Sequence, residues 1–281
     1  MIPKDYLISL IERAYKEDVG DGDHSSLCCI NENTPGKAKL LVKQKGIIAG
    51  VEVAQEVCKY FSSKLKLDIF INDGAKVNIG DIVFEVSGPQ IEILKAERTI
   101  LNFMQRMSGI ATETNRYVDK LSGFNTKVLD TRKTTPGLRL IEKKAVEIGG
   151  GSNHRIGLYD MIMLKDNHID FAGGIEKAIK NANDYLIQTK KNLKIEIEVR
   201  SINDVEKVLK FGSVDRIMLD NFSIQDTLVA VKLINHRFEV ESSGGITYEN
   251  ILEYAKCGVD FISVGALTHQ IKSLDLSLKA I

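Results

Sequence analysis

The sequence predicts an α/β protein in two parts, an N-terminal α/β sandwich followed by an incomplete parallel α/β barrel of six or seven strands. Three observations lead to this fold class. From about Gly123 onward, short apolar runs alternate with amphipathic stretches, the preceding residues follow a different rhythm, and one strand-like run carries charged residues on a single face. Strands that alternate with helices are typical of βαβ units and therefore of a parallel sheet.

The second part contains six strand-like runs separated by helical patterns. The runs are "KVLD", "YDMIMLKD", "KIEIEV", "DRIMLDN", "FEVESS" and "DFISVG". The stretches between them carry helix signals, because Ser201 precedes Asp204 as an N-cap pair, and glycines stand where helices should end. These glycines are Gly149, Gly212 and Gly258. The alternation alone fits either an open doubly wound sheet or an incomplete barrel.

Two details favour the barrel. In "KIEIEVR", the alternation of a strand places Lys194, Glu196 and Glu198 on one face. An interior strand of an open parallel sheet is normally apolar on both faces, whereas the mouth of a barrel accepts inward carboxylates. The last two runs also enter glycine turns, "ESSGGI" and "SVGAL", where such barrels commonly place a phosphate site. Glu196 is interpreted either as an ion-pair partner of Lys194 inside the barrel or as a ligand.

The first part combines helices and strands in a different order. A helix is expected near residues 3–16, strands in "KAKLLVKQKGIIAG" and "LDIFIND", a helix in "VEVAQEVCKYF" and a long helix over about residues 93–121. We therefore expect an N-terminal sandwich domain over residues 1–122 and a barrel domain over residues 123–269. The tail, residues 270–281, is expected to pack back on the first domain.

The composition excludes several classes of protein. Of 281 residues, 43% are hydrophobic and 27% charged, which is typical of a globular rather than a disordered chain. The formal net charge is zero, so we expect no nucleic-acid partner and no membrane partner. The four cysteines lack metal-ligand spacing, and the N-terminus does not resemble a signal peptide. A cytoplasmic protein with reduced thiols is expected.

Polar residues cluster at the C-terminal ends of the predicted barrel strands, and the loop before the second strand contributes two more. In a barrel these ends converge on one mouth. Any one of these residues could be a solvated charge in a turn, but a random surface would not place the whole set so regularly. The set is Asp130, Arg132, Lys133, His154, Arg155, Lys165, Asp166, Asn167, His168, Glu196, Glu198, Asp220, Asn221, Glu241, Ser242, Ser243, Ser263 and Gly265.

The cations of this set point to an anionic substrate. Arg132, Lys133, His154, Arg155 and Lys165 supply five positive or chargeable groups. Arginine binds carboxylates or phosphates through two parallel hydrogen bonds, and lysine acts as a mobile point charge. A substrate with several negative charges is therefore expected. His154 taken alone fits a structural histidine equally well.

The acids and glycines of the set point to a metal ion and a phosphate. Glu198 and Asp220, on separate strands facing one mouth, suit Mg²⁺ shared with substrate oxygens. The turns "SSGG" and "SVGA" expose backbone N–H groups with little side-chain bulk, as a terminal phosphate requires. A polyanion, a phosphate ester and a divalent ion together fit phosphoribosyl transfer. Two roles stay open: Asp130 either orients Arg132 or balances its charge, and His168 either orients its loop or contacts the substrate.

These residues stand in stretches that resemble the quinolinate phosphoribosyltransferase family, the decarboxylating nicotinate-nucleotide pyrophosphorylases. The resemblance runs nearly end to end, through "EDVGDGDHSS", "ERTILNFMQRMSGIAT", "DTRKTTPGLRLIEKKAVEIGGGSNHRIGLYDMIMLKDNHI", "EIEV", "IMLDN", "ESSGGI" and "DFISVGALTH". It implies a phosphoribosyltransferase, one class of glycosyltransferase, with a small α/β sandwich and an incomplete barrel. With Mg²⁺ it joins quinolinate to phosphoribosyl pyrophosphate, forming nicotinate mononucleotide, pyrophosphate and CO₂ in NAD biosynthesis.

The resemblance also implies residue roles. It places Thr131, Arg132, Lys133, His154 and Arg155 at quinolinate, and Ser243, Gly244, Gly245 and Gly265 around the 5′-phosphate. Lys165, Glu198 and Asp220 are the implied catalytic groups: Lys165 lies between the two substrates, and the two acids hold the ribose hydroxyls and Mg²⁺. Family members form homodimers with composite sites, so Arg98 is implied to reach the quinolinate of a neighbouring subunit. On residues alone, Arg98 is simply an exposed charge on a helix.

Alternatives remain. A ModD-like relative shares the architecture, and nicotinate phosphoribosyltransferase acts on a substrate with a single carboxylate, for which Arg132, His154 and Arg155 would be too many cations. A catalytically silent phosphate-binding scaffold would not need the complete set of Lys165, Glu198 and Asp220. The assembly either stops at a homodimer or continues to a hexamer.

Overall fold

The computed structural model describes residues 2–281, which form two compact units. The N-terminal unit comprises Met1–Asn115, Thr134–Gly150 and Leu267–Ile281, and the barrel unit comprises Arg116–Lys133 and Gly151–Ala266. Each unit has its own sheet, and the prediction of an α/β sandwich followed by an incomplete parallel barrel is confirmed.

The N-terminal unit is built on a four-stranded antiparallel sheet. Its strands, in spatial order, are β12 (Leu276–Ala280), β1 (Pro35–Val42), β5 (Ile82–Pro89) and β3 (Lys66–Ile69). Ala38, Leu40 and Val42 are buried at alternate positions of β1, as expected for a strand with one face on a core. A separate two-stranded ribbon pairs β2 (Gly46–Ile47) with β4 (Lys76–Val77).

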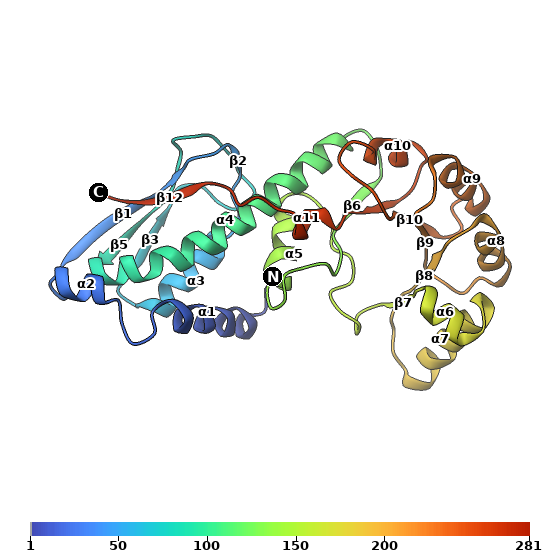
Figure 1. The fold of residues 1–281 in the computed structure, drawn as a ribbon, viewed down its shortest axis with the longest axis horizontal. Helices are drawn as coiled ribbons and strands as arrows, with labels where there is room; N and C mark the ends of the chain where they lie inside the picture. Colours follow the sequence, from blue (N-terminus) through green and yellow to red (C-terminus); the bar gives the residue numbers. More distant parts are fainter. Residues whose placement is uncertain (1) are drawn as a thin grey trace. The chain divides into compact units, whose positions relative to one another are not determined.

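The helices that belong to this unit, wholly or in part, are α1 (Lys4–Asp18), α2 (His24–Cys29), α3 (Val51–Phe61), α4 (Gln90–Lys120), α5 (Arg139–Ile148) and α11 (Ala266–His269). Figure 1 shows α4 running along the sheet beside α1 and α3, and α1 packs against α3. The buried side of α1 consists of Leu7, Leu10 and Ile11, and burying each such side chain contributes about 1.5–3 kcal/mol.

The barrel unit is built on a six-stranded parallel sheet. Its strands, in spatial order, are β6 (Lys127–Leu129), β11 (Phe261–Ser263), β10 (Glu239–Ser243), β9 (Arg216–Asp220), β8 (Ile195–Val199) and β7 (Ile162–Leu164). An isolated parallel bridge joins Leu129 to Ser152, in the loop before β7. Because all six strands are parallel, their carboxyl ends meet at one edge, and this edge carries the polar residues singled out in the sequence.

The barrel helices lie outside the strands (Figure 1). They are α6 (Asp166–Ala172), α7 (Ile175–Thr189), α8 (Ile202–Phe211), α9 (Ile224–Ile234) and α10 (Ile251–Lys256). The predicted N-cap of α8 is confirmed, since Ser201 Oγ accepts a hydrogen bond from the backbone N–H of Asp204, and Gly212 ends the same helix with φ +74°.

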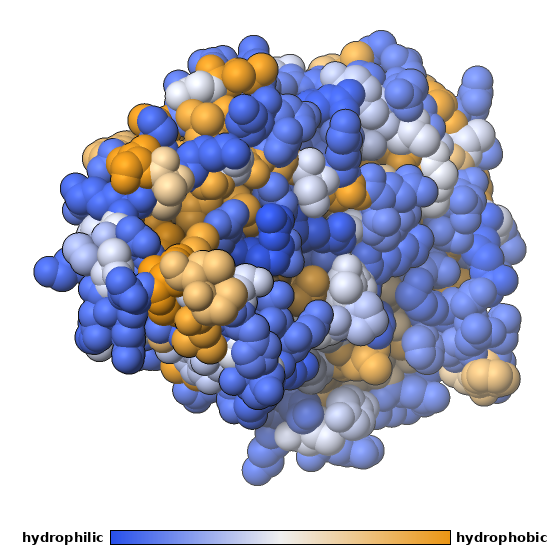
Figure 2. All heavy atoms as spheres, turned by 60° about the vertical axis from the view of Figure 1, so that its left-hand side comes forward, coloured by the Kyte–Doolittle hydropathy of each residue, from blue (hydrophilic) through white to orange (hydrophobic). Residues whose placement is uncertain are grey.

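Two further observations concern the hydropathy of the surface and the length and apolarity of the helices. Figure 2 shows a face on which hydrophilic residues cover most of the area and hydrophobic residues gather in separate patches. None of the helices within residues 2–281 is both long enough and apolar enough to span a bilayer.

Candidate active site

A cavity of about 580 Å³ opens at the carboxyl ends of the barrel strands. All residues to which the family resemblance assigned a role line it, except Arg98 and Gly265. Of the wider strand-end set, Asp130, Asp166, Asn167, His168, Glu196 and Ser242 do not line it. The lining residues are Thr131, Arg132, Lys133, His154, Arg155, Met163, Lys165, Glu198, Met218, Asp220, Asn221, Glu241, Ser243, Gly244, Gly245 and Ser263. Residues from all six barrel strands or their following loops, and from the loop before β7, therefore meet in one pocket, as the parallel topology dictates.

Two guanidinium groups face one side of this pocket. Arg132 follows β6, and Arg155 lies in the loop before β7. Burial lowers the pKa of Arg155, and the positive charge of Arg132 lowers it further, so the two cations are close enough to repel each other. Thr131 Oγ1 accepts a hydrogen bond from the backbone N–H of Lys133 at 3.0 Å, which shapes the loop that carries Arg132. Two adjacent guanidiniums are a site for an anion, because an anion removes their repulsion.

His154 lies at the pocket floor and is only 8% exposed. Its Nδ1 accepts the backbone N–H of Arg155 at 2.6 Å, and its Nε2 lies 3.0 Å from Glu196 Oε2 and 3.5 Å from Glu241 Oε2. Its own backbone N–H donates to Asp130 Oδ1 at 2.9 Å. Asp130 is fully buried, so its carboxylate fixes the main chain of His154, a role that neither sequence interpretation included.

Two buried acids lie beneath His154. Glu196 and Glu241 are fully buried, and burial raises the pKa of each carboxyl to about 7. Arg216 Nη1 donates to Glu241 Oε2 at 2.9 Å, and its Nε and Nη2 donate to Glu239. Lys194 Nζ lies 3.7 Å from Glu239 Oε2, so of the two interpretations considered for Glu196, the ion pair with Lys194 is wrong. Glu196 points into the barrel, where its carboxylate lies beside His154 and away from Lys194.

Lys165 and Glu198 form an ion pair on the wall of the pocket. Lys165 Nζ lies 2.8 Å from Glu198 Oε2, with the lysine side chain about half exposed and the glutamate nearly buried. The backbone N–H of Lys165 donates to His168 Nδ1 at 2.9 Å. His168 therefore orients the start of α6, which is the first of the two roles considered for it. The spacing of His168, three residues after a strand-end residue, is the sequence signal for such a cap.

The carboxyl end of β9 carries two pocket residues, Asp220 and Asn221; the sequence placed both at the barrel mouth but gave Asn221 no role of its own. Asp220 ends the strand, and Asn221 follows it with a left-handed φ of +55°. Asn221 Nδ2 donates to Asp220 Oδ2 at 2.9 Å, and its backbone N–H donates to the carbonyl of Ser243 at 2.9 Å. The sequence signal for this residue was an asparagine directly after an acid that ends a strand, because asparagine is one of the few residues that adopt the left-handed conformation readily.

The glycine turn after β10 completes the pocket. Gly244 and Gly245 have φ values of +90° and +61°, which L residues adopt only with strain. Asn250 holds the turn from behind, because its Nδ2 donates to the carbonyl of Gly245 at 3.1 Å and its Oδ1 accepts the N–H of Thr247 at 2.8 Å. A Cβ at Gly245 would meet nothing within 4 Å, so a ligand can approach this backbone closely.

Two sets of side chains have the chemistry of metal ligands. Glu198 and Asp220 are carboxylates on the pocket wall, which suits Mg²⁺ because this ion binds through one or two carboxylates and keeps several waters. His154, Glu196 and Glu241 also bring ligand atoms within 4.8 Å of one another. Arg216 is already bonded to that buried group, and its positive charge opposes a second cation there. Glu198 is likewise paired with Lys165, but Glu198 and Asp220 both line the pocket, where an ion can also bind substrate oxygens and keep its waters, so they are the better fit.

Arg98 and Gly265, which the family resemblance also assigned to the site, do not line the pocket. Arg98 lies exposed on α4 in the N-terminal unit. Gly265 follows β11 directly after the pocket residue Ser263 and its neighbour Val264.

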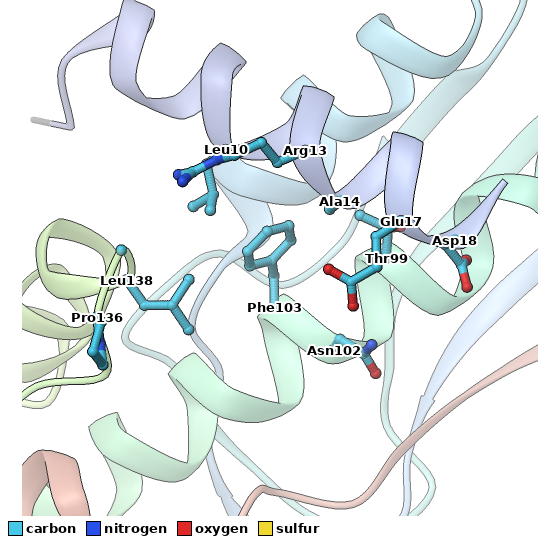
Figure 3. Close-up of a pocket in the computed structure, with 11 residues that line it drawn as sticks. Leu10, Arg13, Ala14, Glu17, Asp18, Thr99, Asn102, Phe103, Pro136 and Leu138 are labelled. Atoms are coloured by element: carbon cyan, nitrogen blue, oxygen red, sulfur yellow. The ribbon is translucent and has the colours of Figure 1, made fainter. Parts of the chain in front are cut away.

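A second hollow, of about 400 Å³, lies within the N-terminal unit between α1, α4 and residues 136–138 (Figure 3). Phe103 points into it from α4, and Leu10 and Leu138 add apolar surface. Its charged residues are Arg13, Glu17 and Asp18, whose opposite signs give no excess of positive charge. This hollow is not suited to a polyanion, so the barrel pocket is the candidate active site.

The fold and the pocket define a class: an α/β-barrel protein whose strand ends carry a pocket lined by cations, carboxylates and a glycine turn. Family models agree, because "Quinolinate phosphoribosyl transferase, N-terminal domain" matches residues 23–108 and "Quinolinate phosphoribosyl transferase, C-terminal domain" matches residues 110–279. The chain belongs to the quinolinate phosphoribosyltransferase family, and the resemblance seen in the sequence is confirmed.

Relatives from distant organisms match along nearly the whole chain. Quinolinate phosphoribosyltransferase [decarboxylating] 1b of Nicotiana tabacum is 45% identical over 288 residues, covering 97% of this chain and 82% of the relative. The probable nicotinate-nucleotide pyrophosphorylase [carboxylating] of Bacillus subtilis (strain 168) is 39% identical over 272 residues, covering 97% and 92%. Family membership therefore rests on both domains and not on a single motif.

Solved structures agree with the fold. The nicotinate-nucleotide pyrophosphorylase from Francisella tularensis superimposes with a TM-score of 0.94 at 40% identity, covering 100% of this chain and 98% of that one. Human nicotinic acid phosphoribosyltransferase reaches a TM-score of 0.68 at 12% identity, covering 98% of this chain and 74% of that one. The second likeness concerns the fold alone.

Proposed function

We propose that this chain transfers the phosphoribosyl group of phosphoribosyl pyrophosphate to quinolinate, with loss of CO₂, and so forms nicotinate mononucleotide and pyrophosphate for NAD biosynthesis. One observation carries the proposal: a single pocket combines a pair of guanidiniums, a lysine–carboxylate pair and a glycine turn with open backbone. Family membership supports the same reaction, since relatives bear names that state it.

The guanidinium side of the pocket suits quinolinate. Its pyridine ring carries two carboxylates, and Arg132 and Arg155, which both line the pocket and repel each other, supply two guanidiniums to pair with them. Lys133 adds a third cation, and Thr131 and His154 shape the backbone around them. Nicotinate carries one carboxylate and would leave part of this positive charge without a partner. The charge of the pocket therefore favours the diacid.

The opposite side suits phosphoribosyl pyrophosphate. Gly244, Gly245 and the nearby Ser243 offer backbone N–H groups to the 5′-phosphate, with Gly265 at the neighbouring strand end. Glu198 and Asp220 both line the pocket, which supports a role for them as acceptors of hydrogen bonds from the ribose hydroxyls and as ligands of Mg²⁺. The bound ion would neutralise the charge that develops on the leaving pyrophosphate.

The reaction then depends mainly on positioning. The pyridine nitrogen forms a bond to C1 of the ribose while the bond from C1 to the pyrophosphate oxygen breaks, and the pyrophosphate takes the bonding electrons. Lys165 Nζ, held by Glu198, supplies positive charge between the two anions. The positively charged ring nitrogen next stabilises the carbanion left when the adjacent carboxylate departs as CO₂, and a proton from solvent replaces it. The two anionic substrates repel each other, and holding them in reacting position requires the many cations of this pocket.

We further propose a homodimer in which Arg98 contributes to quinolinate binding in the neighbouring subunit. Arg98 is exposed on α4, as such a role requires. We also expect a cytoplasmic location, because all four cysteines are free thiols, as is typical of a reducing compartment. Some plant relatives bear mitochondrial or chloroplastic names, so the location needs its own measurement.

One assay tests the proposed function. Purified protein is mixed with Mg²⁺, phosphoribosyl pyrophosphate and either quinolinate or nicotinate, and both mononucleotide and CO₂ are measured. Quinolinate should give both products and nicotinate should give neither in significant amount. Mononucleotide from nicotinate alone contradicts the substrate assignment, and no product from either acid supports the silent phosphate-binding scaffold.

A further inference from the structure

We propose that Asn221 is a positioning residue for the phosphoribosyl half of the pocket, because one carboxamide contacts both Asp220 and the glycine turn after β10. The inference rests on the proposed function, which assigns that half of the pocket to phosphoribosyl pyrophosphate. It adds a residue to which neither the sequence nor the proposed reaction gave a role.

The backbone at Asn221 is the first observation. Its φ of +55° lies in the left-handed region, where glycine would fit without strain. Asn235 also has a left-handed φ, +46°, but it caps the end of α9, where such a residue is common. Asn221 instead stands between β9 and the N-cap of α9, Ser223, and it lines the pocket. Because glycine would fit this backbone without strain, the asparagine side chain at this position indicates a role in the pocket.

The contact with Asp220 is the second observation. Asn221 Nδ2 donates to Asp220 Oδ2 at 2.9 Å. One of the two carboxylate oxygens is thus held from the side, which fixes the plane of the carboxylate and the direction in which its other oxygen points. A carboxylate fixed before the substrate arrives loses less conformational freedom on binding. Asn221 therefore orients the acid proposed to hold the ribose hydroxyls.

The contact with the glycine turn is the third observation. A Cβ at Gly244 would lie 2.3 Å from Asn221 Oδ1 and 2.5 Å from its Cγ, so the carboxamide fills the space where a side chain would be. The backbone N–H of Asn221 also donates to the carbonyl of Ser243 at 2.9 Å. Asn221 thus packs directly against the turn that faces the 5′-phosphate. It sets the spacing between that turn and Asp220, which the ribose 5-phosphate unit must match.

The test compares two substitutions of Asn221 with a matched control. Asn221→Gly keeps the left-handed backbone and removes the carboxamide, and Asn221→Asp keeps the shape but replaces the donor to Asp220 with a second negative charge. Asn235→Gly makes the same change at an equivalent φ outside the pocket. The readout is calorimetric binding of ribose 5-phosphate without Mg²⁺, together with separate KM values for phosphoribosyl pyrophosphate and quinolinate.

We expect Asn221→Gly to bind ribose 5-phosphate about tenfold more weakly than wild type, since a hydrogen bond to a charged group is lost. Asn221→Asp should bind more weakly still, because it adds a negative charge beside a phosphate ester. The KM for phosphoribosyl pyrophosphate should rise in both, the KM for quinolinate should stay within about twofold, and Asn235→Gly should match wild type.

Three results of the calorimetry would overturn the inference: an affinity of Asn221→Gly equal to that of wild type, an equal loss of affinity in Asn235→Gly, or no detectable binding of ribose 5-phosphate by the wild-type protein. A proportional rise in both KM values would indicate a purely structural residue and would overturn it as well. The calorimetry needs no turnover of quinolinate. A failure of the proposed function, seen as no mononucleotide, is therefore distinguishable from a failure of this inference.

Discussion

Replacing Glu142 with alanine is expected to destabilise the N-terminal unit and loosen the segment that follows the pocket residue Lys133. Glu142, on α5, has no exposed surface. Its Oε1 accepts hydrogen bonds from Arg106 Nε at 3.1 Å and Nη2 at 2.8 Å, and its Oε2 accepts the backbone N–H of Thr135 at 3.1 Å. Arg106 Nη2 also donates to Thr135 Oγ1 and to the carbonyl of Thr268. One carboxylate thus joins α4, α5 and the start of the 134–150 segment.

The magnitude follows from the burial of this pair. Removing one partner of a buried ion pair costs about 3–5 kcal/mol, because the other charge is left buried without compensation. The Arg106 side chain is 26% exposed and keeps two other acceptors, so the lower end of that range, about 3 kcal/mol, applies. At roughly 2–4 °C per kcal/mol for a chain of this size, Glu142→Ala should lower Tm by about 6–12 °C. Glu142→Gln keeps an acceptor and should lose about half as much.

The assay is thermal unfolding of both variants beside a matched surface control. Glu147→Gln removes a carboxylate from the same helix, where Glu147 forms an exposed pair with Lys144 at 3.2 Å, and it should change Tm by less than about 2 °C. Quinolinate KM should also rise in Glu142→Ala, because the chain two residues beyond Lys133 loses its anchor at Thr135. A Tm of Glu142→Ala within about 2 °C of wild type would refute the reasoning.

Three further predictions concern the barrel pocket. Gly244→Ala should raise the KM for phosphoribosyl pyrophosphate about tenfold or more, because its Cβ would meet the Asn221 carboxamide at 2.3 Å and its φ is +90°; an unchanged KM would contradict this. Lys165→Ala should lower kcat by about 10²–10³-fold in steady-state assays, whereas the surface variant Lys180→Ala should match wild type. Glu196→Gln should flatten the fall in stability between pH 4.5 and about 7. The folded state holds the Glu196 proton to about pH 7 and the unfolded state releases it near 4.5, so this carboxyl alone lowers the stability of the wild type by roughly 3 kcal/mol over that window. Equal slopes in Tm against pH for the two proteins would contradict this.

Much of the fold could be predicted because its signals are local. Apolar runs of strand length, alternating with helical patterns and ended by residues such as Gly212, give the parallel sheet, and a parallel sheet brings its carboxyl ends to one edge. Eleven of the predicted site residues line one pocket for that reason. The family resemblance supplied the individual roles, which periodicity does not encode.

The rest depends on contacts between residues far apart in the chain. Asp130 bonds the backbone of His154, and Glu196 meets His154 instead of Lys194, because the barrel curvature turns these side chains inward. Asn221 was visible as a strand-end residue, yet its importance depends on a turn more than twenty residues later that packs against its side chain. Pairings of this kind follow from tertiary structure and are not visible as a periodic pattern of residue types in the sequence.

The central claim is that the cationic mouth of the barrel carries the transfer to quinolinate. The most direct measurement is turnover of carboxyl-labelled quinolinate by wild type and by Arg155→Ala, with CO₂ and mononucleotide quantified together. We expect equal amounts of the two products, and a kcat/KM for quinolinate about 10²–10³-fold lower in Arg155→Ala, since a partly buried cation that pairs with a substrate carboxylate is lost. Unchanged kcat/KM in Arg155→Ala, or mononucleotide formed without CO₂, would contradict it.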